Sequence, residues 1–380
     1  CNDEVEAQRS RWTFYETIRI DLQEKENKRM AQTGIVKDNR YMDHVANTYH
    51  PESHQRLEVL YQMLEEPEMK GKLVEIKPRM ATPEELELIH VPRFIQQVAS
   101  TAGHACVMLD PDTYACAKSY ETAKLAAGGT LAAVDEVVGG KLNNAFALIR
   151  PPGHHAESNR AMGFCLFNNV AIAAAYALKK YKLKKALIID WDLHHGNGTQ
   201  HSFYERADVL YFSTHQFPYY PGTGSVNETG SGAGKGFTVN VPLSPGPGDA
   251  EYTEIFEEIL KPIALEYKPD IVFVSAGFDI YHQDPLGGMQ VTPEGFANLA
   301  GIVLAFAKET CGGKVVFVLE GGYHLDGLRD SVRVVLNTLR GDPLDGRRGE
   351  KLRAAVDHRM IDPVIKKVKE AQKPFWKNLC

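Results

Sequence analysis

The sequence predicts a single α/β domain built on a largely parallel sheet. Short runs rich in β-branched residues alternate with helical patterns from Gly34 onward, which is typical of parallel strands joined by helices. The runs over 271–276 and 315–319 are apolar on both faces, as expected of strands that helices cover on both sides. No internal repeat, low-complexity tract or Pro/Ser-rich linker divides the chain, so one domain is the simplest interpretation.

The expected elements follow in order along the chain. Residues 1–32 are charged and lack a capped apolar pattern, so we expect a peripheral N-terminal arm with some helix, followed by a domain over 33–380. One helix is expected to begin after Thr292, a typical N-cap followed by Pro293, and to end at Gly312. Other helices are expected over 120–138, 168–180 and 250–267. Strands are expected at 34–36, 73–76, 145–149, 186–190, 209–213, 237–241, 270–276 and 314–320.

Composition and charge exclude several classes of protein. The 380 residues are 43% hydrophobic and 24% charged, as in a globular domain rather than a fibre. The formal net charge of −6 offers no basic surface for direct nucleic-acid binding and does not repel a cationic substrate. Scattered cysteines without a C-x-x-C pair indicate a reducing compartment, and neither a membrane span nor a signal peptide is visible. We therefore expect a cytoplasmic protein, and a homo-oligomer is left open.

Polar residues concentrate where the predicted strands end. In open α/β sheets, ligands bind beyond the carboxyl ends of the strands. Histidine, aspartate, glycine and tyrosine are frequent in the four segments that follow the strands ending near 149, 189, 276 and 320. Chemistry is therefore expected at this edge of the sheet.

The segment after the strand at 186–190 suggests a metal site. Alternation along the strand puts Asp190, Asp192 and His194 on one side. A lone D-x-H is more often a carboxylate–imidazole hydrogen bond, but a second acidic strand end, at Asp279, can supply a third ligand. Two carboxylates and one imidazole with an open position are typical of catalytic zinc, although Fe²⁺ or Mn²⁺ would also fit.

Two further patterns suggest acid–base chemistry. His154 and His155 follow a stiff Arg-Pro-Pro-Gly segment, and paired imidazoles suit proton transfer near neutral pH, although in isolation two solvated loop histidines would be the commoner interpretation. Asp190 and Asn197 are candidates to hold the far nitrogens of these rings. Tyr323 follows two glycines and could aim its phenol at a developing oxyanion, although a merely buried tyrosine is equally compatible.

A glycine-rich segment over 230–236 is not a phosphate-binding loop. Its glycine spacing is wrong, Gly236 stands where Ser or Thr is required, and a strand rather than a helix follows.

Several motifs together resemble one enzyme superfamily, the histone deacetylases and acetylpolyamine amidohydrolases. Their order and spacing match the family along roughly residues 33–345, and Asn197 and the block at 284–296 are similar to class II and bacterial members. The motifs are HPESHQRL (50–57), RPPGHHA (150–156), GFCLFNN (163–169), DWDLHHGNGTQ (190–200), YYPGTG (219–224), SAGFD (275–279), DPLGGMQVTPEGF (284–296) and LEGGY (319–323).

The resemblance implies a fold, a cofactor and a mechanism. The fold is the arginase-deacetylase fold, with about eight mainly parallel strands flanked by helices. One zinc ion per chain is bound by Asp192, His194 and Asp279. His154 and His155 are the tandem acid–base histidines, and Tyr323 polarises the acetyl carbonyl.

The resemblance also implies roles for residues around this centre. The Gly163 carbonyl holds the substrate amide, and the acyl-lysine channel is lined by Phe164, Tyr220 and Leu286. Arg56 lies beside an internal cavity that releases acetate. A structural potassium ion is held around Asp190, Asp192, His194, Ser213 and Thr214, and in some members a second lies near Phe203, Arg206 and Val209.

The expected substrate is acetylated lysine in proteins or peptides, with acetylpolyamines or other small acylated amines as the alternative. Polyamine-specific eukaryotic relatives carry glutamate where Leu286 stands, so Leu286 favours acyl-lysine. Two other classes are less compatible with the sequence. An inactive acetyl-lysine reader would be expected to lose a ligand, a tandem histidine or the tyrosine, and an arginase-like manganese hydrolase needs more carboxylate ligands.

Overall fold

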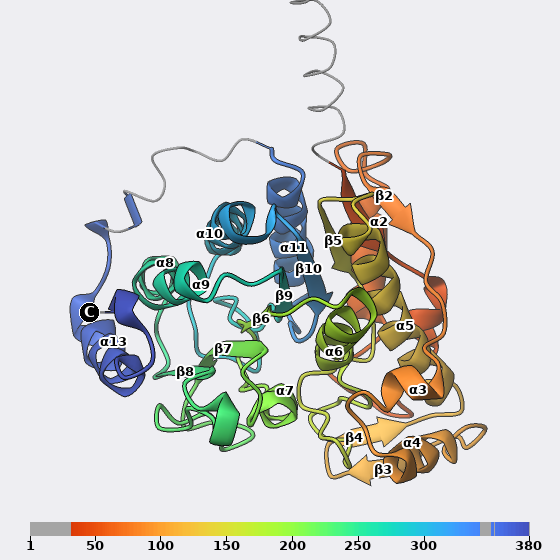
Figure 1. Ribbon diagram of the computed structural model, residues 1–380. Coiled ribbons are helices and arrows are strands. Elements are labelled where there is room, and N and C mark those ends of the chain that lie inside the picture. Colours follow the sequence, from red (N-terminus) through yellow and green to blue (C-terminus); the bar gives the residue numbers. More distant parts are fainter. Residues whose placement is uncertain (1–31, 343–350, 353, 380) are drawn as a thin grey trace, which may run out of the picture. The chain divides into compact units, whose positions relative to one another are not determined.

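Eight parallel strands form the centre of the fold, in the order β2-β1-β5-β10-β9-β6-β7-β8 (Figure 1). The computed structural model describes residues 32–342, 351–352 and 354–379. The predicted mainly parallel eight-stranded sheet is confirmed. Its strands are β1 (Thr33–Val36), β2 (Val74–Ile76), β5 (Asn144–Ala147), β6 (Ala186–Asp190), β7 (Val209–Gln216), β8 (Thr238–Leu243), β9 (Ile271–Ala276) and β10 (Val315–Leu319).

Helices cover both faces of this sheet. On one face α5 (Ser119–Val138) packs on β1, β5 and β10, and α6 (Asn169–Tyr181) packs on β6 and β9 (Figure 1). On the other face α10 (Pro293–Cys311) contacts β9, and α11 (Leu325–Leu339) contacts β5. Every residue of β6, β9 and β10 is buried, which explains why these strands are apolar on both faces.

The predicted helices are present with small differences at their ends. The Thr292 hydroxyl accepts a hydrogen bond from the Gly295 amide at the start of α10, and Gly312 ends the helix with a φ of 65°. The helix predicted over 250–267 is divided by a π-helical turn into α8, η3 and α9. The remaining bounds are η1 (Asn39–Asp43), α2 (Gln55–Leu64), α3 (Pro83–Leu86), α4 (Pro92–Ala99), α7 (Asn197–Phe203), η2 (Gly232–Gly234), α8 (Asp249–Ile255), η3 (Phe256–Leu260), α9 (Lys261–Tyr267), α13 (His358–Gln372) and η4 (Lys377–Leu379).

A small antiparallel hairpin, β3 (Val107–Asp110) and β4 (Thr113–Ala115), stands apart from the main sheet. The sequence did not predict it.

The predicted N-terminal arm, apart from Gln32, lies outside the described residues, and the domain boundary at residue 33 stays a prediction. Cys106, Cys116, Cys165 and Cys311 are free thiols. Across the described segments, no helix combines the length and the apolar character that crossing a membrane requires. The cytoplasmic location stays a prediction.

The sheet order brings distant parts of the sequence to one edge. β10 lies between β5 and β9, and β6 lies beside β9. Because all four strands are parallel, the segments that follow them leave the sheet side by side. These are the segments in which the sequence places its candidate catalytic residues.

Candidate active site

Asp192, His194 and Asp279 converge beyond the ends of β6 and β9. Each offers one ligand atom, and these atoms all lie within 4.8 Å of one another. His194 Nδ1 lies 3.1 Å from Asp192 Oδ1 and 3.1 Å from Asp279 Oδ2. Backbone amides hold both carboxylates, since Gly321 donates to Asp192 Oδ2 at 2.8 Å and Leu193 donates to Asp279 Oδ1 at 2.9 Å.

The charge balance of this cluster fits a bound cation. Both carboxylates are fully buried. Burial and the neighbouring Asp192 raise the pKa of Asp279 to about 7. The two carboxylates outweigh the effect of burial on His194 and raise its pKa to about 9. A divalent cation would neutralise this excess negative charge, and two carboxylates with one imidazole match the ligands of catalytic zinc.

The tandem histidines lie next to this cluster, and different groups hold them. His154 Nδ1 lies 3.1 Å from Asp190 Oδ2, while His155 Nδ1 lies 2.8 Å from Asn197 Oδ1. Burial alone would lower the pKa of His154, but Asp192 and Asp190 outweigh it and raise this pKa to about 10. Burial and the neighbouring His154 lower the pKa of His155 well below its ordinary value. In the metal-free protein the pKa values of the two imidazoles are therefore shifted in opposite directions.

Buried charges hold the backbone around Tyr323. Arg56 donates from Nε to the Gly322 carbonyl at 2.7 Å and from Nη2 to the Glu320 carbonyl, and its guanidinium lies 5.1 Å from the centre of the Tyr323 ring. Asp284 accepts from the Tyr323 amide at 2.6 Å. The Glu320 carboxylate accepts from the Gly153 amide at 2.7 Å and so links this loop to the tandem histidines.

A cavity of about 80 Å³ joins these groups. All of the residues that the sequence predicts for catalysis and substrate binding line it, together with the metal ligand His194. The lining consists of Asp112, Pro152, His154, His155, Gly163, Phe164, His194, Tyr220, Leu286, Gly321 and Tyr323.

The hairpin β3–β4 supports one wall of this cavity. Gly163 and Phe164 have φ values of 57° and 67°, a conformation that is strained for phenylalanine. Asp112 Oδ1 accepts from the Gly163 amide at 3.0 Å, and Thr113 Oγ1 accepts from the Phe164 amide at 3.0 Å. The sequence interpretation missed Asp112, and the only signal in the sequence was a Pro-Asp turn between two short strands.

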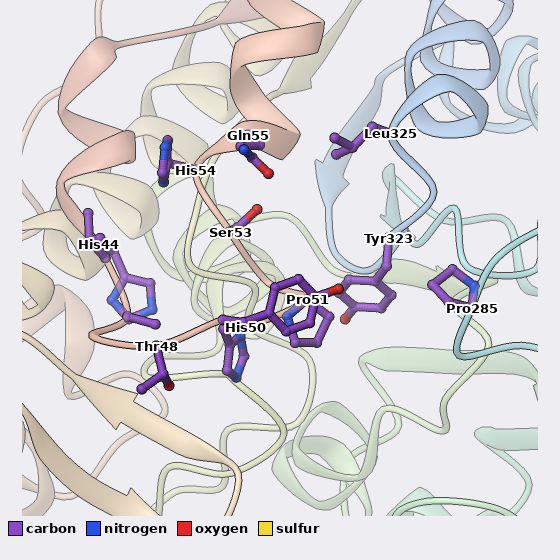
Figure 2. A pocket seen from close by; sticks show the side chains of 13 residues that line it. His44, Thr48, His50, Pro51, Ser53, His54, Gln55, Pro285, Tyr323 and Leu325 are labelled. Atoms are coloured by element: carbon purple, nitrogen blue, oxygen red, sulfur yellow. The ribbon is translucent and has the colours of Figure 1, made fainter.

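A second cavity, of about 260 Å³, also has Tyr323 in its lining (Figure 2). It is formed mainly by the segment from His44 to Gln55, together with Pro285 and Leu325. His50, which lines this second cavity, packs edge to face against Phe164 of the first, with ring centres 4.6 Å apart.

The potassium sites implied by the resemblance remain predictions. Ser213 Oγ lies 2.9 Å from His215 Nδ1, and the side-chain hydroxyl of Thr214 is buried. The Arg206 guanidinium lies over the Phe203 ring at 5.1 Å, near Val209, the first residue of β7.

Comparisons with known proteins agree with this geometry. A family model described as a histone deacetylase domain matches residues 50–339. "Histone deacetylase 10, chloroplastic" of Oryza sativa subsp. japonica is 40% identical over 311 residues, covering 77% of this chain and 70% of the rice protein. "Polyamine deacetylase HDAC10" of Homo sapiens is 39% identical over 345 residues, covering 86% of this chain and 49% of the human protein.

A solved structure supports the same assignment. The crystal structure of the HDA15 HD domain is similar with a TM-score of 0.83 and 37% identity, covering 92% of this chain and 97% of that chain. The predicted arginase-deacetylase fold is therefore confirmed, and the chain belongs to the histone deacetylase family.

Proposed function

We propose that this protein is a zinc-dependent deacetylase that hydrolyses N-acetyl amides. The first candidate substrate is the acetyl-lysine side chain of proteins or peptides. One observation carries the proposal. The tandem histidines, Tyr323 and His194 of the candidate metal site all line one narrow cavity. Amide hydrolysis needs an electrophile activator, a proton carrier and an oxyanion donor, and this cavity offers all three.

Asp192, His194 and Asp279 would hold the zinc ion. Bound zinc supplies a Lewis acid that polarises the acetyl carbonyl and lowers the pKa of water. The two potassium ions implied by the resemblance belong to the proposal as structural ions.

The remaining steps belong to the side chains of this chain. His155 accepts a proton from the attacking water, assisted by His154, whose Nδ1 is held by Asp190. The Tyr323 hydroxyl donates a hydrogen bond to the acetyl oxygen, and this bond strengthens as the oxygen gains negative charge. His155 then returns the proton to the amine that leaves.

The walls of the cavity suit a lysine-like chain. Phe164 and Tyr220 are aromatic residues in the cavity lining, and aromatic rings pack well against methylene groups. The Gly163 carbonyl is proposed to accept the substrate amide N–H. A cavity of about 80 Å³ suits a short acyl group.

Acetylated polyamines or other small acylated amines are the second candidate. The observation in their favour is Asp112, a carboxylate that lines the cavity and would attract a second amine. A human relative 39% identical to this chain is named a polyamine deacetylase. Leu286 argues against this candidate, because it places an apolar side chain in the cavity.

The test offers the zinc-loaded protein an equimolar mixture of an acetyl-lysine peptide, free acetyl-lysine, acetylputrescine and acetylspermidine. Mass spectrometry follows each product, and a variant with both His154→Ala and His155→Ala is the control for contaminating enzymes. Preferred deacetylation of the peptide supports the first candidate, and preferred deacetylation of the polyamines supports the second. If no product forms although one zinc ion is bound per chain, the proposal is wrong and an inactive reader becomes the better interpretation.

A further inference from the structure

The side-chain amide of Asn197 lies between the catalytic candidate His155 and a carboxylate, Glu157. Its Oδ1 lies 2.8 Å from His155 Nδ1. Its Nδ2 lies 2.5 Å from Glu157 Oε1, 3.3 Å from the His155 carbonyl oxygen and 3.4 Å from Met162 Sδ. Asn197 and His155 are both buried.

The surroundings allow only one orientation of this amide. A carboxylate, a carbonyl oxygen and a thioether sulfur surround Nδ2, and all of them are hydrogen-bond acceptors. If the amide were turned by about 180°, its oxygen would face the Glu157 carboxylate, and the contact would be repulsive. The NH₂ group of Asn197 must therefore face Glu157, and its oxygen must face His155.

This orientation determines which nitrogen of His155 carries a proton. Asn197 Oδ1 can only accept, so His155 Nδ1 must donate. In the neutral imidazole the proton then sits on Nδ1, and Nε2 keeps its lone pair. Because His155 lines the catalytic cavity, Nε2 is the nitrogen that can take a proton from water.

We propose that Glu157 is a positioning residue for hydrolysis: its carboxylate fixes the Asn197 amide and thereby keeps His155 in the tautomer that can act as a base. The inference rests on the proposed function, because it assigns Glu157 a role in the same reaction. Glu157 does not line the cavity, so it acts through Asn197.

The position of Glu157 fits this role. Its side chain is 12% exposed, and His201 Nδ1 lies 2.9 Å from Oε1 and 3.1 Å from Oε2. Asn197 and His201 both belong to α7, so the carboxylate also ties this helix to the segment after β5. If Glu157 had a purely structural role, it would only link α7 to the segment after β5. Measurements of kcat and of the His155 tautomer distinguish this structural role from a positioning role.

The first measurement compares Glu157→Gln with the wild type, both loaded with zinc. A glutamine has no charge and can present either end of its amide to Asn197, so the orientation of Asn197 is no longer fixed. We expect kcat to fall by about 10–100-fold, by analogy with the loss of groups that orient metal-binding histidines, with KM changed less than about twofold. Glu66→Gln is the matched control, because Glu66 pairs with Arg333 at the surface and should change neither constant.

The second measurement observes the tautomer itself. In protein labelled with ¹⁵N-histidine, the His155 signals are identified by their loss in His155→Asn. In the wild type at pH 8 we expect a neutral ring with its proton on Nδ1, and in Glu157→Gln a mixture of the two tautomers. An unchanged tautomer in Glu157→Gln would overturn the inference, whatever the value of kcat, and leave Glu157 with a structural role only.

A double-mutant cycle keeps the inference testable even if Glu157→Gln folds poorly. Asn197→Asp alone places a second carboxylate about 2.5 Å from Glu157, so we expect a large loss of kcat. In the double variant, the new glutamine can donate to the new aspartate, which still accepts from His155. We expect the double variant to be more active than Asn197→Asp alone, whereas additive losses would contradict the coupling.

The two proposals can fail separately. A wild-type protein that deacetylates its substrate but shows no tautomer change in Glu157→Gln refutes only the role of Glu157. A wild-type protein without deacetylase activity, whose His155 tautomer nevertheless responds to Glu157, refutes the proposed function and supports the coupling.

Discussion

Glu52 is a fully buried carboxylate that pairs with two fully buried arginines, so Glu52→Gln tests how the site is held together. Arg150 donates to both of its oxygens, with Nη2 2.8 Å from Oε2, and Arg56 Nη1 lies 3.2 Å from Oε1. Burial opposes ionisation, but Arg150, His44 and Arg56 outweigh it and lower the pKa of Glu52 to about 2. Glutamine keeps the shape of the side chain but removes the negative charge that pairs with both guanidinium groups.

The size of the effect follows from these values. The difference between the ordinary pKa of 4.5 and about 2 corresponds to about 3 kcal/mol of folding free energy at neutral pH. Because the pKa is lowered in the folded state, this stabilisation is complete above about pH 4.5 and is lost as the pH falls towards 2. This value agrees with the cost of breaking a buried ion pair, which is typically about 3–5 kcal/mol. We expect a loss of about 3–5 kcal/mol in the free energy of unfolding at pH 7.5.

The assay is urea denaturation with zinc held at a saturating concentration, followed by tryptophan fluorescence. Glu66→Gln removes an exposed ion pair with Arg333 and should cost less than about 1 kcal/mol. Turnover of the folded Glu52→Gln protein should also fall, because Arg56 holds the two carbonyls that flank the Tyr323 loop. If Glu52→Gln is no less stable than Glu66→Gln, the reasoning about this buried cluster is wrong.

Three further changes test the site. Tyr323→Phe should lower kcat by about 10²–10³-fold with zinc still bound, because one oxyanion donor is lost; near-normal turnover would remove Tyr323 from the mechanism. Asp279→Asn should abolish zinc binding measured by mass spectrometry, yet stabilise the metal-free protein at pH 8 by up to about 4 kcal/mol, since the pKa of Asp279 is raised from 3.8 to about 7 and its charge opposes folding above that pH. Gly163→Ala should lower kcat at least about tenfold, because an added Cβ would lie 2.3 Å from His155 Cδ2, whereas Gly140→Ala, equally strained but with open space, should leave kcat unchanged.

The sequence predicted the sheet and the positions of its polar strand ends because both follow from local patterns. β6, β9 and β10 are apolar on both faces, and once their ends are known to be adjacent, Asp192, His194 and Asp279 must be neighbours. The assignment of roles to the tandem histidines and Tyr323 came from the motifs.

The missed features depend on distant contacts that no local pattern records. The hairpin that carries Asp112 has strands of only four and three residues, too short to show a clear apolar period, and β3 is partly exposed. The pairing of Glu52 with Arg150 spans 98 residues, and the contact of Arg56 with the Gly322 carbonyl spans 266. Nothing near Glu157 in the sequence indicates that its partners would be Asn197 and His201 on α7.

The central position of β10 has a consequence for how the protein is made. β10 is the last strand of the sheet in chain order, yet it joins β2-β1-β5 on one side to β9-β6-β7-β8 on the other. During synthesis the edges of β5 and β9 that later pair with β10 stay unpaired until β10 has emerged. Unpaired strand edges can associate with other chains. The metal ligands follow β6 and β9, whereas the tandem histidines follow β5 and Tyr323 follows β10 itself. A growing chain therefore contains all the proposed metal ligands before it contains Tyr323, the proposed oxyanion donor, which directly follows the strand that completes the sheet.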